Sequence, residues 1–570
     1  MASEMGSEKQ VAFGGKGIKI AVTELIEEVQ ELYLADQIPW VVGYSGGKDS
    51  SAVLQLVWLA VSRLPVEQRT KQIHVISTDT LVEQPLVAVW VDASHAKMRE
   101  AAAEQGVPLT PHKLVPDVKD TFWVNLIGKG YPKPTTQFRW CTSRMKINPS
   151  NNFIRQVVRE NGEAMLVLGT RKAESQRRAR NMEKHEKHRY RERVSPNAAL
   201  PNSLVYSPIE DWNNDEVWQF LMQVKNPWGH TNKSLMGMYQ GASADNECPV
   251  VLDTSTPSCG SSRFGCWVCT VVDKDRSMEA MIKNDDEKLW MQPLLDLRNE
   301  LACDEDGLRD VELVQIGLTK SEIARLGKTD EKGKPVRLSK ENRGKVERNR
   351  RDFRRLDGRV QLFNGKTIPG PYRKNWREYW LKRVLEVQQG IRENGPREMR
   401  ELELISTAEM HEIRRVWLYE KHEYDDTLPD IYKQVTGEDF PVLRGDDQLL
   451  DREDWDRLRG ICDADEVFFQ LQTELLDIQR EFRGMTRRAG IYEAIEKRLK
   501  AAQFSDGEEA FAARDAEQKR ADEIREMRTL RKDRPEGVKT PKKNSAAKKA
   551  TKVSSAQPDL FDQQSTDETE

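Results

Sequence analysis

The residues of this sequence best suited to chemistry form a short turn, Ser-Gly-Gly-Lys-Asp-Ser, at positions 45–50. A glycine-rich turn between a strand and a helix presents backbone N–H groups and a helix N-terminus, which together bind phosphate. The two glycines let the backbone approach closely, Lys48 can neutralise phosphate oxygens, and Asp49 can help to hold Mg²⁺ or cap the helix. The spacing differs from the G-x-x-x-x-G-K-[ST] motif, so it predicts another kind of phosphate site. The predicted nucleotide-binding turn comprises Ser45, Gly46, Gly47, Lys48, Asp49 and Ser50.

Four of the seven cysteines form a second chemical group, separated by ten, six and two residues. Thiolates this close, in a chain without a secretory signal, predict a metal centre. Four thiolates suit both structural zinc and a 4Fe–4S cluster. The single C-x-x-C favours the cluster, because zinc ribbons pair two such knuckles; redox or unliganded thiols are the third alternative. The predicted metal ligands are Cys248, Cys259, Cys266 and Cys269, whereas Cys303 and Cys462 stand alone and are expected to be ordinary buried cysteines.

Three further segments extend the pattern of the turn: TTQFRWCTSRMKINP at 135–149, LGTRKAESQRR at 168–178 and SPIEDWNNDEVWQFL at 207–221. With the turn, and in the same order, they resemble the motifs of the PP-loop ATP pyrophosphatase superfamily and of its PAPS reductase-like branch. The string STDT at 77–80 stands where that family has a strand end near the adenine and ribose, although an ordinary strand end is the alternative there. The resemblance implies further nucleotide contacts from Asp79, Gly169, Arg171, Glu174, Ser175 and Arg178.

Cys141 lies inside the first of these segments and has three candidate roles: sulfur-carrying nucleophile, cluster ligand or packed residue. Its neighbours Arg139, Arg144 and Lys146 predict a lowered thiol pKa, which favours a reactive cysteine. The predicted catalytic residues are Lys48, Asp49, Cys141 and Arg171.

The string SRFGCWVCTVV at 262–272, followed by a long Arg-rich helical half, resembles the DndC family, the PAPS reductase-like sulfurtransferases of DNA phosphorothioate modification. The resemblance covers about residues 15–500. It implies ATP, Mg²⁺ and a 4Fe–4S cluster as cofactors, cleavage of ATP to AMP and pyrophosphate, and replacement of a non-bridging DNA oxygen by sulfur. It implies DNA, a cysteine desulfurase as sulfur donor and other subunits of the modification system as partners. A tRNA thiolase, a sulfonucleotide (PAPS/APS) reductase and a non-catalytic, nucleotide-regulated DNA-binding subunit remain open.

The elements that must position these residues alternate between strand and helix. That alternation predicts an α/β fold with a doubly wound parallel sheet, and the resemblance implies the adenine nucleotide alpha-hydrolase (PP-loop) type. A Cys-rich cluster segment and a mostly helical C-terminal region follow. The charged residues 172–194 predict a mobile loop. Strands are expected at 38–45, 72–80 and 164–171, and helices at 18–35, 50–62 and 85–105.

Composition and segment boundaries complete this outline. The chain has 570 residues, of which 32% are charged, with net charge -3 and mean hydropathy -0.72. No segment is apolar and long enough for a secretory signal or a membrane span, so we expect a cytoplasmic protein without a membrane partner. The expected segments are a flexible lead-in at 1–17, a PP-loop domain at 18–235, a Cys-rich cluster-binding segment at 236–275, a helical basic domain at 276–504, and a charged helix with a disordered tail at 505–570.

Two basic stretches and one short motif concern partners. Residues 332–359 hold twelve Lys/Arg and four Asp/Glu, which suits DNA phosphates, although a solvated helix face is an equally good interpretation. The tail at 531–552 is also basic and could tether DNA weakly. QPDLF, Gln557–Phe561, matches the Q-x-x-L-F pattern of bacterial peptides that dock on the replication sliding clamp, and chance is the alternative.

Overall fold

A six-stranded sheet organises the first part of the chain, in the order β3-β2-β1-β4-β6-β5. Neighbouring strands from β3 to β6 are parallel, and β5 joins β6 antiparallel at one edge. Trp40 of β1 pairs with Ile73 on one side and Met165 on the other. The predicted doubly wound α/β class is therefore confirmed. The strands are β1 (Trp40–Gly43), β2 (Ile73–Thr78), β3 (Leu109–Leu114), β4 (Ala164–Val167), β5 (Val194–Pro196) and β6 (Ser203–Tyr206).

The computed structural model describes residues 12–14, 17–186, 194–243, 264–303, 308–315, 317–326, 328, 336, 338–354, 360–363, 366–441, 452–462, 465–482, 488, 490–504 and 507–532. Two of the predicted metal ligands, Cys248 and Cys259, lie outside these residues, as do the basic tail at 533–552 and Gln557–Phe561. The described chain divides into two compact units, Met1–Phe511 and Ala512–Glu570.

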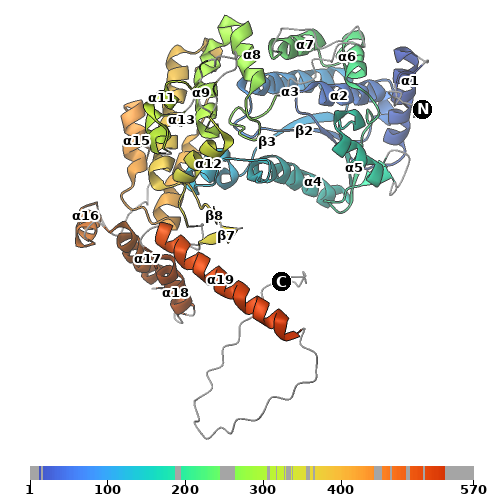
Figure 1. Cartoon of the computed structure of the whole chain (residues 1–570). Helices are drawn as coiled ribbons and strands as arrows, with labels where there is room; N and C mark the ends of the chain where they lie inside the picture. Colours follow the sequence, from blue (N-terminus) through green and yellow to red (C-terminus); the bar gives the residue numbers. More distant parts are fainter. Residues whose placement is uncertain are drawn as a thin grey trace, which may run out of the picture. The chain divides into compact units, whose positions relative to one another are not determined.

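Side chains alternate between the two faces of the sheet, as the pleat requires. Trp40 and Val42 point into a large core formed with the helices of one face, whereas Val41 joins Ile154 and Val157 in a smaller core on the other. Both faces of the parallel sheet are therefore covered, which explains why its strands are continuously apolar. The helices over the larger core are α1 (Ile18–Leu34), α2 (Lys48–Ser62), α3 (Pro85–Gln105) and α6 (Asn214–Gln223), and α4 (Asn148–Asn161) covers the smaller one. Figure 1 shows strands β2 and β3 of the sheet between helices α2 and α3 on one side and α4 on the other.

Two segments differ from the sequence-based expectation. Strand β3 was not predicted, because its sequence LTPHKL contains Pro111; β3 is an edge strand, where a residue without an N–H group is tolerated. The expected loop at 172–194 is wrong for residues 176–186, which form helix α5 (Gln176–Glu186). Its Arg, Lys, Glu, Met and Ala residues have high helix propensity, and this outweighs the density of charge.

The segment between β3 and α4 leaves the sheet and enters the core of the helical half. The Trp123 indole donates to the Leu404 carbonyl (2.7 Å), and the Trp417 indole donates to the Ile127 carbonyl (3.0 Å). Met145 is buried in the same cluster. The Cys141 region is thus fixed by helices that lie far away in sequence. Those helices are α8 (Arg276–Asn284), α9 (Gln292–Ala302), α13 (Lys374–Asn394) and α14 (Thr407–Arg415).

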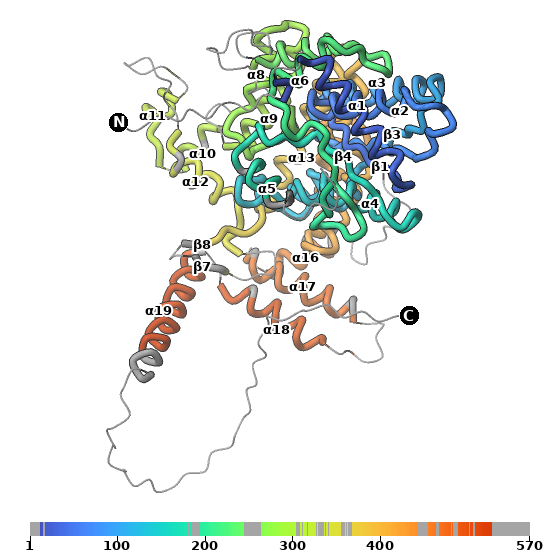
Figure 2. Tube along the Cα trace, turned by 90° about the vertical axis from the view of Figure 1, so that its right-hand side faces the viewer, coloured from blue at the N-terminus to red at the C-terminus, as the bar shows by residue number. Residues whose placement is uncertain are grey.

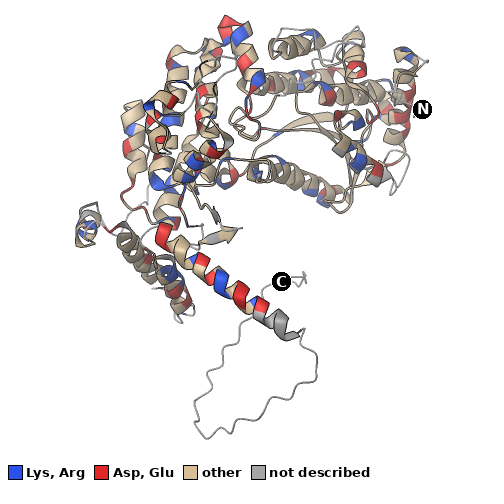
Figure 3. Cartoon of the chain, in the orientation of Figure 1, with Lys and Arg blue, Asp and Glu red and all other residues tan. Residues whose placement is uncertain are grey.

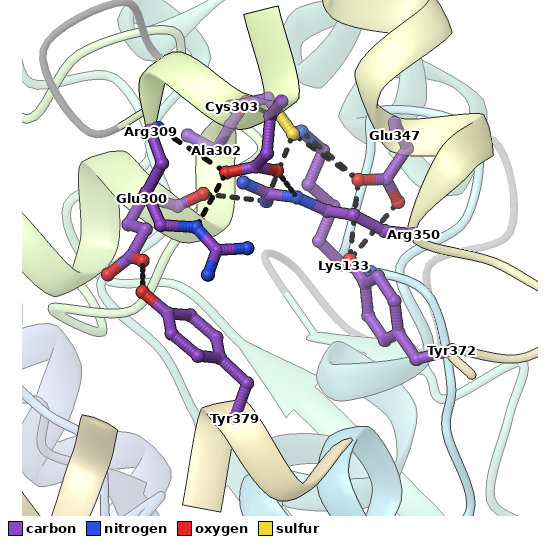
Figure 4. Close-up of polar contacts among 10 residues, drawn as sticks. Lys133, Glu300, Ala302, Cys303, Arg309, Glu347, Arg350, Tyr372 and Tyr379 are labelled. Carbon is purple, nitrogen blue, oxygen red and sulfur yellow. Dashed lines mark hydrogen bonds and ion pairs between the residues drawn. The ribbon is translucent and has the colours of Figure 1, made fainter. Parts of the chain in front are cut away.

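A buried ionic network strengthens this connection (Figure 4). Arg350, fully buried, donates from Nε to Glu312 (2.8 Å) and from Nη1 to the Cys303 sulfur (3.2 Å). Lys133, from the segment that follows β3, lies 3.7 Å from Glu347, whose carboxylate also accepts from the Cys303 thiol (3.5 Å). Cys303 is buried as expected, and Arg350 of the basic stretch 332–359 is engaged inside the protein.

The remaining helices, apart from α7 (Asn232–Gly241), belong to the C-terminal part of the chain. Helices α10 (Asp310–Gln315), α11 (Lys320–Ile323) and α12 (Lys340–Asn349) form a group of their own (Figure 2). Acidic and basic side chains interleave along the 26-residue helix α19 (Gly507–Lys532) (Figure 3). Within the described ranges, no helix combines the length and apolar character that a membrane span requires. The other elements are α7 (Asn232–Gly241), the hairpin β7–β8 (Gln361–Phe363, Lys366–Ile368), α15 (Thr427–Thr436), α16 (Arg452–Ile461), α17 (Glu466–Phe482) and α18 (Ile491–Ala501).

Candidate functional site

The strand order reverses beside β1, and this places a crevice at the carboxyl end of that strand. The chain runs outward through β1, β2 and β3, then crosses back to lie on the other side of β1 as β4. Open α/β sheets bind ligands at such a switch point. A cavity of about 920 Å³ opens there and is lined by all six residues of the turn 45–50. Its size suits a nucleotide.

The turn has a preformed phosphate-binding shape. Gly46 has φ +73°, and a Cβ at this position would lie 2.6 Å from Val91. The Ser50 hydroxyl accepts from the Ser45 N–H group (3.1 Å) and donates to the Gly47 carbonyl (3.0 Å). Helix α2 starts at Lys48 without a capping side chain from Gly47, and the Lys48 N–H group donates to the Tyr239 hydroxyl (3.3 Å). The structure thus brings all six turn residues to one cavity, and their role in nucleotide binding stays a prediction.

Asp49 links the two predicted catalytic cations. Its Oδ2 lies 2.9 Å from Lys48 Nζ, and its Oδ1 lies 2.7 Å from Nε of Arg171. Arg171 is 3% exposed, and its Nη1 donates to the Trp212 carbonyl (3.1 Å). Both carboxylate oxygens are therefore occupied by cations, which favours a positioning role over either Mg²⁺ binding or capping.

The donor set for Mg²⁺ is accordingly poor. The part of the chain that the structure describes holds no group of three His, Cys, Asp or Glu side chains suited to a metal ion. Magnesium commonly arrives on the phosphates of its nucleotide, with only one or two protein carboxylates. Asp49 would have to release Lys48 or Arg171 to reach it, so no chemical step is assigned to Mg²⁺ here.

Other predicted nucleotide contacts gather around the same cavity. A Cβ on Gly169 would lie 2.9 Å from the Asp49 carbonyl, so only glycine lets the end of β4 approach α2 this closely. Asp79 accepts from the Leu81 N–H group (2.8 Å) and lies 2.9 Å from Lys113. The lining includes Asp79, Gly169, Arg171, Glu174 and Arg178, and the last two form an ion pair. Ser175 does not line the cavity; its hydroxyl accepts from the Arg178 N–H group (3.2 Å).

Three lining residues were not assigned to this cavity from sequence. Tyr239 of α7 accepts from the Lys48 N–H group (3.3 Å), and burial raises its pKa to about 12. Glu83 and Lys146 line the wall nearest the cysteines and form an ion pair of 3.1 Å. Lys146 lies in the segment 135–149, which carries one of the sequence motifs described above, whereas Tyr239 and Glu83 lie in none of them.

The C-x-x-C segment is attached to the rim of this cavity. The Gln84 N–H group donates to the Gly265 carbonyl (3.2 Å), and the Trp267 N–H group donates to the Val82 carbonyl (3.0 Å). Cys266 Sγ lies 3.3 Å from the Thr80 hydroxyl, and burial raises the pKa of this thiol to about 12. The backbone bridge that pairs Cys266 with Glu83 thus holds the thiol beside the nucleotide cavity.

The Cys269 N–H group donates to the Cys266 carbonyl (3.0 Å), which closes the turn between the two cysteines. Two sulfur donors on such a turn fit half of a zinc or iron–sulfur site. The other two predicted ligands, Cys248 and Cys259, belong to the segment 244–263 outside the described residues. The residues on the two sides of this segment meet at the cavity. There the rings of Tyr239 and Phe264 pack edge to face, with their centroids 4.8 Å apart.

The predicted lowering of the Cys141 pKa is wrong. Burial raises the pKa of this thiol, and the nearby Cys269 thiol raises it further. Arg144 does not act on the thiol, because its guanidinium binds Asp120 (3.0 Å) and Asn125 (2.9 Å). The structure nevertheless brings Cys141 close to the C-x-x-C pair: Cys269 acts on the pKa of Cys141, and both Cys266 and Cys141 act on the pKa of Lys146.

Comparison with known proteins agrees with this geometry. Residues 39–271 match the family described as phosphoadenosine phosphosulfate reductase domain. This match spans less than half of the chain and supports a place for these residues in the PAPS reductase-like superfamily.

An uncharacterized protein of Methanocaldococcus jannaschii is 24% identical over 262 residues, which is 46% of this chain and 42% of that protein. A phosphate complex of the PAPS reductase from Candida auris shares 13% identity, with 38% of this chain and 88% of that chain covered and a TM-score of 0.22. The FMN adenylyltransferase of Candida glabrata with FAD and inorganic pyrophosphate shares 12% identity, with coverages of 44% and 75% and a TM-score of 0.24.

Proposed function

We propose that this protein is an ATP-dependent sulfurtransferase that inserts sulfur into the DNA backbone. The observation that supports this proposal most directly is that the turn 45–50 and the C-x-x-C segment meet at one cavity. Glu83 and Lys146 line this cavity together with the turn, and Glu83 is bridged through its backbone to Cys266. A phosphate activated at the turn would thus form next to thiols. Sulfur transfer to an activated phosphate needs this combination of groups.

The first step would activate the DNA phosphate. A non-bridging oxygen of the phosphodiester attacks the α-phosphorus of ATP, the bond to the β-phosphate oxygen breaks, and pyrophosphate leaves with the electron pair. Lys48 and the N-terminus of α2 stabilise the charge of that leaving group. Asp49 holds Lys48 and Arg171 in place, and Arg178 at the cavity wall can bind a phosphate of ATP or DNA.

The second step would replace AMP by sulfur. A sulfur nucleophile attacks the DNA phosphorus, and AMP leaves with the oxygen that made the first attack. Hydrosulfide does this without a change of oxidation state. If the sulfur comes from a persulfide on Cys141, loaded by a cysteine desulfurase, the sulfur bound to the DNA phosphorus would still be joined to Cys141 by an S–S bond. A second thiol must then attack the Cys141 sulfur, which releases the thiolated DNA and forms a disulfide with Cys141. A 4Fe–4S cluster, which Cys248, Cys259, Cys266 and Cys269 would hold, supplies inorganic sulfide and electrons.

The partners and location follow from the same proposal. The protein would act in the cytoplasm on DNA, with a cysteine desulfurase and other subunits of the modification system. Arg350 and Arg351 of the basic stretch are engaged inside the protein, since Arg351 donates to the Gly370 carbonyl (2.7 Å), so other cations of 332–359 would have to reach DNA. Docking of Gln557–Phe561 on a sliding clamp stays a prediction.

The test is ATP turnover by protein purified without oxygen, with radiolabel on the α-phosphate. We expect AMP formation that depends on DNA and on a sulfur donor, and phosphorothioate linkages in the digested DNA by mass spectrometry. Lys48→Ala should lower the rate by about 10²–10³-fold, as expected for loss of a charge-stabilising group. The matched control is Lys433→Ala, which removes an exposed lysine paired with Asp439.

Other results of this assay identify the alternatives. AMP formation with tRNA and not with DNA would indicate a tRNA thiolase. Sulfite release from PAPS without ATP cleavage would indicate a sulfonucleotide reductase, and binding without turnover a regulatory subunit. Iron, sulfide and zinc contents of the same sample decide between a 4Fe–4S cluster and a zinc knuckle.

A further inference from the structure

A second cavity, of about 300 Å³, lies in the helical half of the chain and shares no lining residue with the nucleotide cavity. Its walls come from the N-terminus of α13, the segment 420–425 and α17. Seven of the lining side chains are Lys or Arg and five are Asp or Glu. This excess of cations around a small enclosed space raises the question of which anion the cavity suits.

The N-terminus of α13 supplies backbone donors. This 21-residue helix begins at Lys374, has no acidic residue in its first turn and is preceded by Arg373, whose side chain makes no capping hydrogen bond. A guanidinium has only donors, so the Arg373 side chain cannot cap the helix. The Arg373 carbonyl accepts from the Trp376 N–H group (3.1 Å), which leaves the N–H groups of Lys374 and Asn375 for a ligand. Those groups carry the partial positive charge of the helix N-terminus, and a phosphate is their common ligand.

Arg377 adds a buried donor one turn into the same helix. Its side chain is 3% exposed, Nε donates to the Tyr372 carbonyl (3.2 Å), and Nη2 pairs with Glu423. Its Nη1 is buried and has no hydrogen-bond partner among the described residues. Glu423 likewise keeps one buried oxygen, Oε2, without a partner there. A guanidinium edge with an unused donor is suited to a phosphate oxygen, and a protonated phosphate oxygen could donate to Glu423.

Lys421 contributes a side chain that has no direct ion pair among the described residues. It lines the cavity and is half-buried; its backbone N–H group donates to the Val416 carbonyl (3.0 Å), but its Nζ makes no hydrogen bond with a residue that the structure describes. Burial and the neighbouring Arg377 guanidinium lower its pKa to about 8. The acids of the wall are already engaged: Asp352 with Arg354, Glu420 with Arg415, Glu423 with Arg377, Asp425 with Lys374 and Glu474 with Arg498.

We propose that this cavity binds a phosphate group, held by the first N–H groups of α13, Nη1 of Arg377 and Nζ of Lys421. The phosphate could belong to a DNA strand or to free phosphate or a nucleotide. The DNA source rests on the proposed function, whereas the phosphate site itself does not. The volume accommodates a phosphate with part of an attached sugar and is smaller than the nucleotide cavity.

The test is lysine footprinting of the full-length protein. Brief acetylation with acetic anhydride, followed by mass spectrometry, gives the modification rate of each lysine. Lys421 reports on the proposed site, Lys433 is the internal control, and Lys48 reports on the nucleotide cavity. The additions are inorganic phosphate, sodium chloride at equal ionic strength, duplex DNA, a duplex with neutral methylphosphonate linkages, and ATP.

We expect phosphate at about ten times its Kd to slow acetylation of Lys421 about tenfold, while chloride and Lys433 show no such effect. Protection by natural DNA and not by the methylphosphonate duplex identifies a strand phosphate as the ligand. Protection by phosphate alone identifies a free anion. No protection in any of these additions, or equal protection of Lys433, would overturn the proposal.

Two further readings separate this inference from the proposed function. If ATP protects Lys48 while nothing protects Lys421, the phosphate site at Lys421 is refuted and the nucleotide site is not. If phosphate or DNA protects Lys421 while ATP does not protect Lys48, the nucleotide site is refuted and the phosphate site is not. Where DNA protects Lys421, Lys421→Gln should weaken DNA binding about tenfold and Lys433→Gln should leave it unchanged. Equal affinity of the two variants would overturn DNA as the ligand.

Discussion

Replacing Gly46 by alanine should damage the nucleotide-binding turn in two separable ways. The backbone there has φ +73°, which costs an L-residue about 1–2 kcal/mol. The new methyl group would also lie 2.6 Å from Val91 and 3.3 Å from Trp90, inside the carbon contact distance of about 3.5–4.0 Å. Helix α3 would have to move, and such overpacking costs about 1–3 kcal/mol. We therefore expect the free energy of unfolding to fall by about 2–5 kcal/mol.

Gly162→Ala provides the matched control, because Gly162 has φ +84° and no atom within 4 Å of the position of a Cβ. It should show the backbone cost of about 1–2 kcal/mol alone. Urea unfolding followed by tryptophan fluorescence measures both variants. Titration calorimetry with ATP should show an affinity at least about tenfold weaker for Gly46→Ala and unchanged for Gly162→Ala. Equal losses of stability in the two variants, or normal ATP binding by Gly46→Ala, would refute the reasoning.

Three further predictions concern groups outside the turn. Arg350→Ala leaves the buried Glu312 paired with Arg309 alone (3.3 Å) and removes the donor to the Cys303 sulfur, so it should lower the free energy of unfolding by about 1–3 kcal/mol in urea titrations, whereas exposed Arg348→Ala should change it by less than about 0.5 kcal/mol. Burial lowers the pKa of His95 from 6.5 to about 4, so the unfolded state binds more protons between these values, and His95 should cost up to about 3 kcal/mol of stability as the pH drops through this window. His95→Gln should remove this contribution, whereas that of His230, whose pKa burial also lowers to about 4, should stay. The raised pKa of Cys141 predicts that its alkylation by iodoacetamide, followed by mass spectrometry, still accelerates above pH 9, and a plateau below pH 8 would contradict this.

The location of the nucleotide site was predictable because its chemistry is contiguous. Residues 45–50 carry the glycines, the lysine and the flanking strand and helix pattern within one stretch, and local sequence determines such a turn. The central strands were predictable for a similar reason, since both faces of a parallel sheet are buried and its strands are continuously apolar. Strand β3 was not predicted because it contains Pro111. Proline is tolerated in an edge strand, but a sequence pattern does not show which strand lies at the edge of a sheet.

The walls of the site were not predictable, because distant segments meet there. Tyr239 reaches Lys48 across 191 residues, and Glu83 is paired with Cys266 across 183. The error at Cys141 has the same origin. Counting nearby cations predicts a reactive thiol, but Arg144 points to Asp120 and burial determines the pKa. Side-chain direction and burial are properties of the fold, so a local count of charges does not supply them.

The contact between Tyr239 and Lys48 has a consequence for how the two halves of the site communicate. A phosphate at the Lys48 N–H group must displace the Tyr239 hydroxyl or share its donor, and Tyr239 also contacts Phe264, which leads into the C-x-x-C segment. Metal bound to that segment should therefore alter ATP affinity, by about fivefold for one hydrogen bond. Thermodynamic linkage requires ATP to alter metal affinity by the same factor.

Calorimetry with ATP, before and after removal of the metal by a chelator, measures this coupling, and chelator competition with and without ATP measures its reciprocal. Tyr239→Phe keeps the ring contact with Phe264 and removes the hydroxyl, so it should abolish the coupling while the metal stays bound. Coupling that persists in this variant would show that the cysteine segment acts on the turn by another route, for which the Glu83–Lys146 pair is the remaining connection at the cavity rim.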